Sequence, residues 1–168
     1  MNRGVVVIGY PGVGKSTLSD QDKTFVDLES SDFVIGTEKI KNWEILYSNL
    51  ATSIAVQNKV VFVSSHKVVR DHLLSLPKFE DIDIMAVVPS VELKDDWIQK
   101  LEARYKESWL AKDYYAYLRS KDYYEEDIQN LKADFAEKSL PVVELTSLEY
   151  DLRGLILNCI FENFHFMP

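Results

Sequence analysis

The sequence has few of the residues that would mark an exported or nucleic-acid-binding protein. Its 168 residues include a single cysteine, Cys159, which provides no disulfide framework and is typical of a reducing cytosol. Lysine and arginine number 19 against 27 acidic residues, and the net charge of −8 argues against duplex nucleic acid as the main partner. No apolar run approaches membrane-spanning length, and the first apolar run begins within four residues. We therefore expect a cytoplasmic protein with neither a membrane nor a duplex nucleic acid as partner.

The remaining composition is that of a globular protein, with 46% hydrophobic and 27% charged residues. This length predicts one domain, residues 1–168, with a sizeable core. Short apolar runs alternate with longer stretches of helical periodicity, which predicts a parallel α/β sheet with right-handed crossovers. The expected strands are 4–8, 24–29, 59–64, 82–88 and 141–145, and the expected helices are 15–21, 37–56, 66–76, 91–110, 122–138 and 148–161, with a looser segment at 111–121.

Glycine is also scarce, with six residues, yet three of them stand at 9–14, directly after the apolar run Val5–Ile8. The stretch reads Gly-x-x-x-x-Gly-Lys-Ser between a predicted strand and a predicted helix, which is the P-loop pattern in its required setting. Its backbone amides are expected to cradle a polyphosphate, with Lys15 on the β- and γ-phosphates and Ser16 on Mg²⁺. The predicted residues for binding ATP are Gly9, Tyr10, Pro11, Gly12, Val13, Gly14, Lys15, Ser16 and Thr17.

Several classes of P-loop protein do not fit the sequence. A GTPase requires an Asn-Lys-x-Asp base reader, but the only similar residues, Asn58–Val61, continue into an apolar run. A motor or AAA ATPase requires an apolar strand that ends in acids, whereas the third and fourth strands end in Ser64–His66 and Pro89–Ser90. Only the second run ends in acids, Asp27 and Glu29, at the strand edge where ligands of such sheets bind.

In its P-loop, order of elements and length, the chain resembles the small P-loop kinases, the group of nucleoside monophosphate kinases and shikimate kinases. It looks like a trimmed member of the type encoded by phages. The resemblance implies a three-layer P-loop NTPase fold with a five-stranded parallel sheet of order 2-3-1-4-5. It also implies a helical lid-like segment at about 100–125. ATP and Mg²⁺ would be the cofactors, with Ser16 and Asp27 as metal ligands and with Lys15, Asp27 and Arg104 as catalytic residues.

Two further segments resemble the lid of adenylate kinases. Lys100-Leu101-Glu102-Ala103-Arg104 stands where those enzymes have two arginines four residues apart, a spacing that puts both cations on one helical face. Arg119-Ser120-Lys121-Asp122 is similar to their lid-closing Arg-x-Asp-Asp run. The resemblance therefore implies that Lys100 and Arg119 bind substrate and that Arg104 stabilises charge on the γ-phosphate.

The acceptor is less constrained by the sequence. Where the related kinases have Thr-Gly-Asp-Leu-Leu-Arg, residues 30–35 read Ser-Ser-Asp-Phe-Val-Ile, which keeps the acid Asp32 but lacks the arginine that clamps an acceptor phosphate. Glu29, Asp32 and Arg70 are the remaining candidates for acceptor binding. The favoured function is ATP-dependent phosphoryl transfer to a (deoxy)nucleoside monophosphate or nucleoside. A kinase for a non-nucleotide hydroxyl and a nucleotide-binding regulatory protein without turnover stay open.

Overall fold

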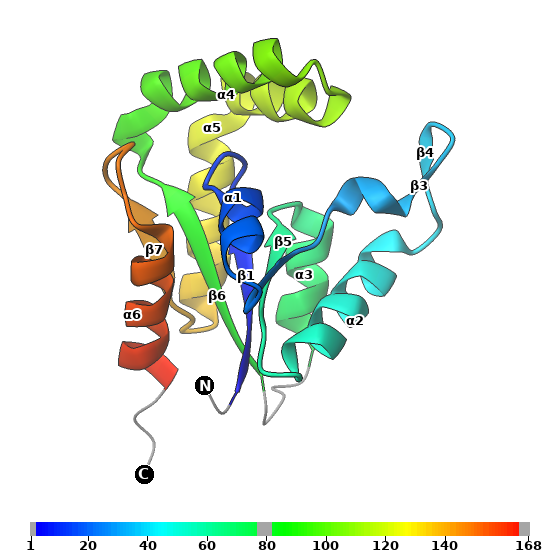
Figure 1. Cartoon of the computed structure of the whole chain (residues 1–168), viewed down its shortest axis with the longest axis vertical. Coiled ribbons are helices and arrows are strands. Elements are labelled where there is room, and N and C mark those ends of the chain that lie inside the picture. Colours follow the sequence, from blue (N-terminus) through cyan, green and yellow to red (C-terminus); the bar gives the residue numbers. More distant parts are fainter. Residues whose placement is uncertain (1–2, 77–81, 165–168) are drawn as a thin grey trace.

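The sheet stands at the centre of the molecule. The computed structural model describes residues 3–76 and 82–164. Five parallel strands lie in the order β2-β5-β1-β6-β7, with the P-loop strand in the middle (Figure 1). A central parallel strand is covered on both faces, which explains why its sequence is apolar at every position. The strands are β1 Gly4–Gly9, β2 Phe25–Asp27, β5 Val60–Ser64, β6 Ile82–Pro89 and β7 Val142–Leu145.

The strand order differs from the predicted one in the numbers that the strands carry. The prediction was 2-3-1-4-5, whereas the order in chain numbering is 2-5-1-6-7. The difference arises from two short strands that the prediction lacked, β3 Val34–Ile35 and β4 Glu38–Lys39. These two pair antiparallel as a separate hairpin and do not join the sheet. The hairpin projects away from the sheet beside α2 (Figure 1).

Helices cover both faces of the sheet and also cross its upper edge (Figure 1). In that view α4 and the first half of α5 lie above the carboxyl ends of the strands. No helix in the described ranges combines the length and the apolar composition that a bilayer span requires. The helices are α1 Lys15–Gln21, α2 Trp43–Ala55, α3 Lys67–Ser75, α4 Lys94–Ser108, α5 Ala111–Glu137 and α6 Leu152–Phe164, with short 3-10 turns at Ser30–Phe33 and Val91–Leu93.

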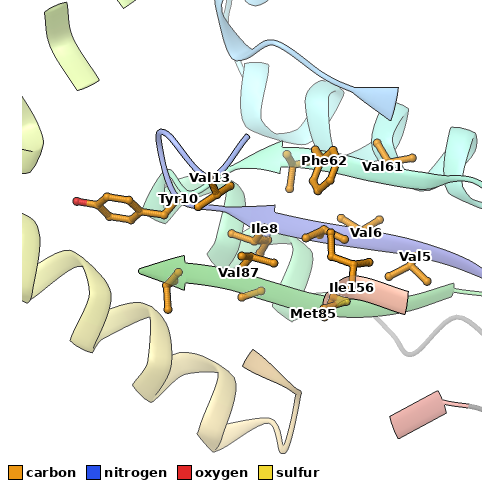
Figure 2. Close-up of a cluster of buried hydrophobic side chains, with 14 of the residues drawn as sticks. Val5, Val6, Ile8, Tyr10, Val13, Val61, Phe62, Met85, Val87 and Ile156 are labelled. Atoms are coloured by element: carbon orange, nitrogen blue, oxygen red, sulfur yellow. The ribbon is translucent and has the colours of Figure 1, made fainter. Parts of the chain in front are cut away.

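The core lies on both faces of the three central strands. Val5, Val6, Val7 and Ile8 are all fully buried, as are most side chains of β5 and β6. Figure 2 shows these side chains packed along the strands, and it shows Tyr10 leaving the strand end toward α5. Burial of β1 on both sides fixes the place where the chain turns into the P-loop.

Two predicted helices begin four or more residues later than expected. The helix predicted for 37–56 begins at Trp43, because Glu38 and Lys39 pair with the strand before them in the hairpin. The helix predicted for 148–161 begins at Leu152, where the Asp151 carboxylate accepts a hydrogen bond from the Gly154 amide at 3.0 Å and caps the first turn.

The segment predicted to be looser, 111–121, is helical, and this expectation was wrong. α5 runs from Ala111 to Glu137, with one non-helical residue, Tyr123, where the axis kinks. The first part of α5 is held by contacts with other elements, including an ion pair between Arg104 and Asp113. Its Lys- and Tyr-rich composition does not reveal these contacts.

Candidate active site

The P-loop connects β1 to α1 and closes through two glycines in the left-handed region. Gly12 has a φ of 86° and Gly14 a φ of 94°, values that side chains disfavour. At Gly12 the space is also filled, because a Cβ atom there would lie 3.0 Å from the side chain of Leu101. Consecutive amides in such a turn form a concave nest that binds anions.

Lys15 lies folded against the loop. Its ammonium donates to the carbonyl of Gly9 at 2.9 Å and to that of Tyr10 at 3.3 Å. Burial lowers the pKa of Lys15 to about 8, while the nearby carboxylates of Asp27 and Glu29 oppose this shift. The cation is therefore poised next to the nest in an environment that favours an anionic partner.

Ser16 and Asp27 meet at the first turn of α1. The Ser16 hydroxyl donates to the Asp27 carboxylate at 2.6 Å, so the P-loop and the end of β2 bring two oxygen ligands together. Burial raises the pKa of Asp27, and the hydrogen bond from Ser16 opposes that rise. Mg²⁺ prefers oxygen ligands and commonly takes only one or two from protein, with phosphates and water completing its shell. The pair fits such an ion, and the described residues contain no larger cluster of acids, histidines or cysteines for a protein-only metal site.

A cleft of about 1940 Å³ opens beside the P-loop. Its walls come from the P-loop, the end of β2, the start of α3, and from α4 and α5, which contain the lid-like segment. Of the predicted site residues only Asp32 is not part of this lining, because it is exposed on the 3-10 turn after β2. The predicted residues that the cleft brings together are Gly9 to Thr17, Asp27, Glu29, Arg70, Lys100, Arg104 and Arg119.

The two arginines of the lid-like segment are held by acids of α5. Arg104 pairs with Asp113 at 2.5 Å, and Asp113 also accepts a hydrogen bond from Ser108 at 2.6 Å. Arg119 makes two hydrogen bonds to Asp127, at 2.7 and 2.6 Å. Each arginine is thus fixed in direction while it borders the cleft.

Arg70 is almost fully buried, with 4% of its surface exposed. It donates to Asp134 of α5 at 2.6 Å and to the carbonyl of Ser65 at 3.1 Å. The guanidinium therefore ties α3 and the end of β5 to α5 while it lines the cleft.

Lys100 lies among aromatic rings. Its ammonium is 4.2 Å from the ring centroid of Trp97 and 5.3 Å from that of Tyr150, and it donates to the Tyr150 hydroxyl at 3.2 Å. Burial lowers the pKa of Lys100, and the neighbouring Arg104 adds to this effect. Lys100 therefore makes structural contacts with the two rings and also lines the cleft.

Sequence reasoning missed several cations of the cleft lining, and one of them lies in the lid-like segment. Lys112, in the first turn of α5, pairs with Glu29 at 2.7 Å and so connects the lid-like segment to the end of β2. Its charge lies close enough to act on the pKa values of both Lys15 and Asp27. Local sequence offers one weak signal for it, a lysine inside the lid-like segment, and the partner is 83 residues away in the chain.

The wall opposite the lid-like segment was also missed in part. Lys39 of the β3–β4 hairpin donates to the Ser30 carbonyl and lies 4.2 Å from the centroid of the Trp43 ring. His66, at the start of α3, packs edge-on against the same ring. Burial lowers the pKa of His66, and the charges of Lys39 and Arg119 lower it further. Lys39 and His66 line the part of the cleft next to β2 and β5.

Comparison with known proteins supports the architecture. No family model matches the sequence, and no curated protein matches it. Sixteen chains of solved structures match the fold. One is a gluconokinase from Sinorhizobium meliloti 1021, with a TM-score of 0.54 and 14% identity over 98% of this chain and 97% of that chain. At this identity the similarity establishes the fold alone.

The chain shares the α/β fold of that gluconokinase. Its five-stranded parallel sheet carries the Gly-x-x-x-x-Gly-Lys-Ser stretch directly after the central strand. One fold can host many reactions, so the chemistry depends on the residues of the cleft.

Proposed function

We propose that this chain is a kinase that transfers the γ-phosphoryl group of ATP to a hydroxyl of a small acceptor. The observation that carries the proposal is the convergence of three features on one cleft. These are the P-loop with Lys15, the oxygen pair of Ser16 and Asp27, and the cations of the lid-like segment. Phosphoryl transfer depends mainly on positioning and charge neutralisation, and these are the groups it requires.

In this mechanism the P-loop amides and Lys15 hold the triphosphate, and Mg²⁺, when bound, neutralises its developing charge. Ser16 and Asp27 would be the protein ligands of that ion. Glu29 orients the acceptor hydroxyl and accepts its proton as the oxygen bonds to the γ-phosphorus and ADP leaves. Lys112 and Arg104 face the same space from the lid-like segment and stabilise the charge on the transferring group.

The state of the arginines favours a hydroxyl acceptor. Arg70 and Arg119 are both engaged by carboxylates of α5, and the Arg119–Asp127 pair presents donors together with acceptors to the cleft. Such mixed groups suit the hydroxyls of a sugar, a sugar acid or a nucleoside. The solved gluconokinase of the same fold makes a sugar acid the first acceptor to examine.

A nucleoside monophosphate, one of the two acceptors that the sequence favours, is the second candidate. The observation that supports it is the presence of Arg70 in the cleft lining. To clamp a phosphate, however, Arg70 would have to share its guanidinium with Asp134 or leave it.

The proposal is tested by measuring ADP release from Mg·ATP with sugars, sugar acids, nucleosides and nucleoside monophosphates as acceptors. We expect turnover with a hydroxyl acceptor and none in Lys15→Ala. Turnover only with monophosphates would replace the first candidate by the second. ATP binding without stimulation by any acceptor would leave a nucleotide-binding protein in place of an enzyme.

Variants assign the roles. Glu29→Gln keeps the size of the side chain but removes the proton acceptor, and it should lower kcat at least tenfold with little change in the KM for ATP. Asp32→Asn is the matched control, because Asp32 is an exposed acid of the same loop outside the cleft. Equal losses in the two variants would remove Glu29 from the mechanism.

A further inference from the structure

Two aromatic side chains contact the carbonyls of the P-loop, and we call them the aromatic bracket: Trp97 of α4 and Tyr150 from the loop before α6. The indole N–H of Trp97 donates to the carbonyl of Pro11 at 2.9 Å. The Tyr150 hydroxyl lies 3.5 Å from the carbonyl of Gly12. The two rings stack at 6.4 Å, and Lys100 lies over both. The bracket therefore contacts two successive carbonyls of the loop.

These contacts engage carbonyls of the loop, whereas the groups proposed to bind phosphate are its amides. The carbonyl of Pro11 and the amide of Gly12 belong to one peptide group, so a donor on the carbonyl polarises the amide and strengthens it as a donor to an anion. The carbonyl of Gly12 and the amide of Val13 are related in the same way. A loop whose carbonyls are already bonded also loses less conformational entropy when it binds.

Trp97 is the principal member of the bracket. Its side chain is fully buried, and the loop carbonyl is the acceptor of its indole N–H. Its ring also lies against Gly12, where a Cβ atom would be 3.2 Å from the indole nitrogen. The same residue thus fixes both the direction of the Pro11 carbonyl and the space around Gly12.

We propose that Trp97 is a positioning residue for nucleotide binding, which sets the P-loop in its anion-binding form before the nucleotide arrives. The inference rests on the proposed function of the loop. Because Trp97 belongs to α4, which continues into the lid-like segment, it also connects the position of that segment to the affinity for nucleotide.

The experiment measures the Kd of Mg·ADP by calorimetry for Trp97→Phe, which keeps an aromatic ring and removes the N–H donor. We expect about a fivefold higher Kd, the effect of one typical buried hydrogen bond. Tyr150→Phe should raise the Kd less, because its contact with the loop is longer. Trp109→Phe is the matched control and should bind as the wild type does, since Trp109 is 73% exposed at the end of α4.

A structural role would give a different result. If Trp97 only fills the core, Trp97→Phe lowers the Tm and leaves the Kd unchanged, and the proposal is overturned. If the wild type does not bind Mg·ADP, the proposed function and this inference both fail. If the wild type binds Mg·ADP and Trp97→Phe binds it with the same Kd, this inference alone fails.

A second measurement covers the case in which Trp97→Phe does not fold. In the Trp43→Phe/Trp109→Phe variant, Trp97 supplies the one remaining indole N–H resonance, because the chain has three tryptophans. This resonance should shift when Mg·ADP binds, because phosphate at the Gly12 amide polarises the peptide group to which the indole donates. An unmoved resonance at saturating Mg·ADP would contradict the proposal.

Discussion

The buried contact between Arg70 and Asp134 yields a prediction whose size follows from the structure. Asp134→Ala removes the carboxylate from a guanidinium that is 4% exposed and leaves only the Ser65 carbonyl as its partner. Breaking a fully buried ion pair costs about 3–5 kcal/mol. Because a third of the Asp134 side chain is exposed, water solvates part of the orphaned charge. We therefore expect the free energy of unfolding to fall by about 2 kcal/mol in Asp134→Ala.

Urea unfolding followed by circular dichroism measures this change. The double variant Arg70→Met/Asp134→Ala should recover part of the loss, because it leaves no buried charge without a partner. Glu137→Ala is the control on the same helix, since its side chain is 76% exposed and its loss should cost under about 0.5 kcal/mol. Two results would refute the view that Arg70 ties α3 to α5. One is a free energy of unfolding for Asp134→Ala within about 0.5 kcal/mol of the wild type. The other is a loss in the double variant that equals the sum of the losses in Arg70→Met and Asp134→Ala.

Three more predictions concern the cleft. A bound phosphate should raise the pKa of Lys15 from about 8, so Mg·ADP binding near pH 8 should take up protons and weaken at higher pH. Calorimetry in buffers of different ionisation enthalpy detects this proton uptake, and Lys15→Met should abolish it. Lys112→Ala should lower kcat about tenfold and change the Tm little, because its ion pair with Glu29 is partly exposed. Lys112→Arg should restore much of the rate, and an unchanged kcat in Lys112→Ala would contradict a role for Lys112 in stabilising the transferring group. Gly12→Ala should lower the free energy of unfolding in urea by more than about 1 kcal/mol, and by more than Gly36→Ala, because Gly36 also has a positive φ but has open space around it. Equal losses in the two variants would show that Leu101 does not constrain Gly12.

The sequence predicted those elements whose structure is determined by a local residue pattern. A buried parallel strand must be apolar on both faces, so the run before the P-loop and the runs at 59–64 and 82–88 were recognisable as strands. The P-loop glycines were recognisable because only a backbone with positive φ closes that turn, and Gly12 and Gly14 have such values.

Features that no local periodicity or motif marks were not predicted. The β3–β4 hairpin replaced the start of a predicted helix, and residues 111–121 became helical through packing on α4. The partners of the cleft arginines could not be foreseen either. Arg70 pairs with an acid 64 residues away, whereas the sequence offers 27 acids as candidates.

The most direct measurement of the central claim follows the γ-phosphate of ATP by phosphorus NMR in the presence of Mg²⁺ and a panel of hydroxyl acceptors. The account predicts that the γ-phosphate signal is replaced by a phosphomonoester of one acceptor, together with ADP, and that Lys15→Ala leaves ATP intact. Unchanged ATP, or release of inorganic phosphate alone with every acceptor, would contradict the assignment of this cleft as a phosphotransferase site.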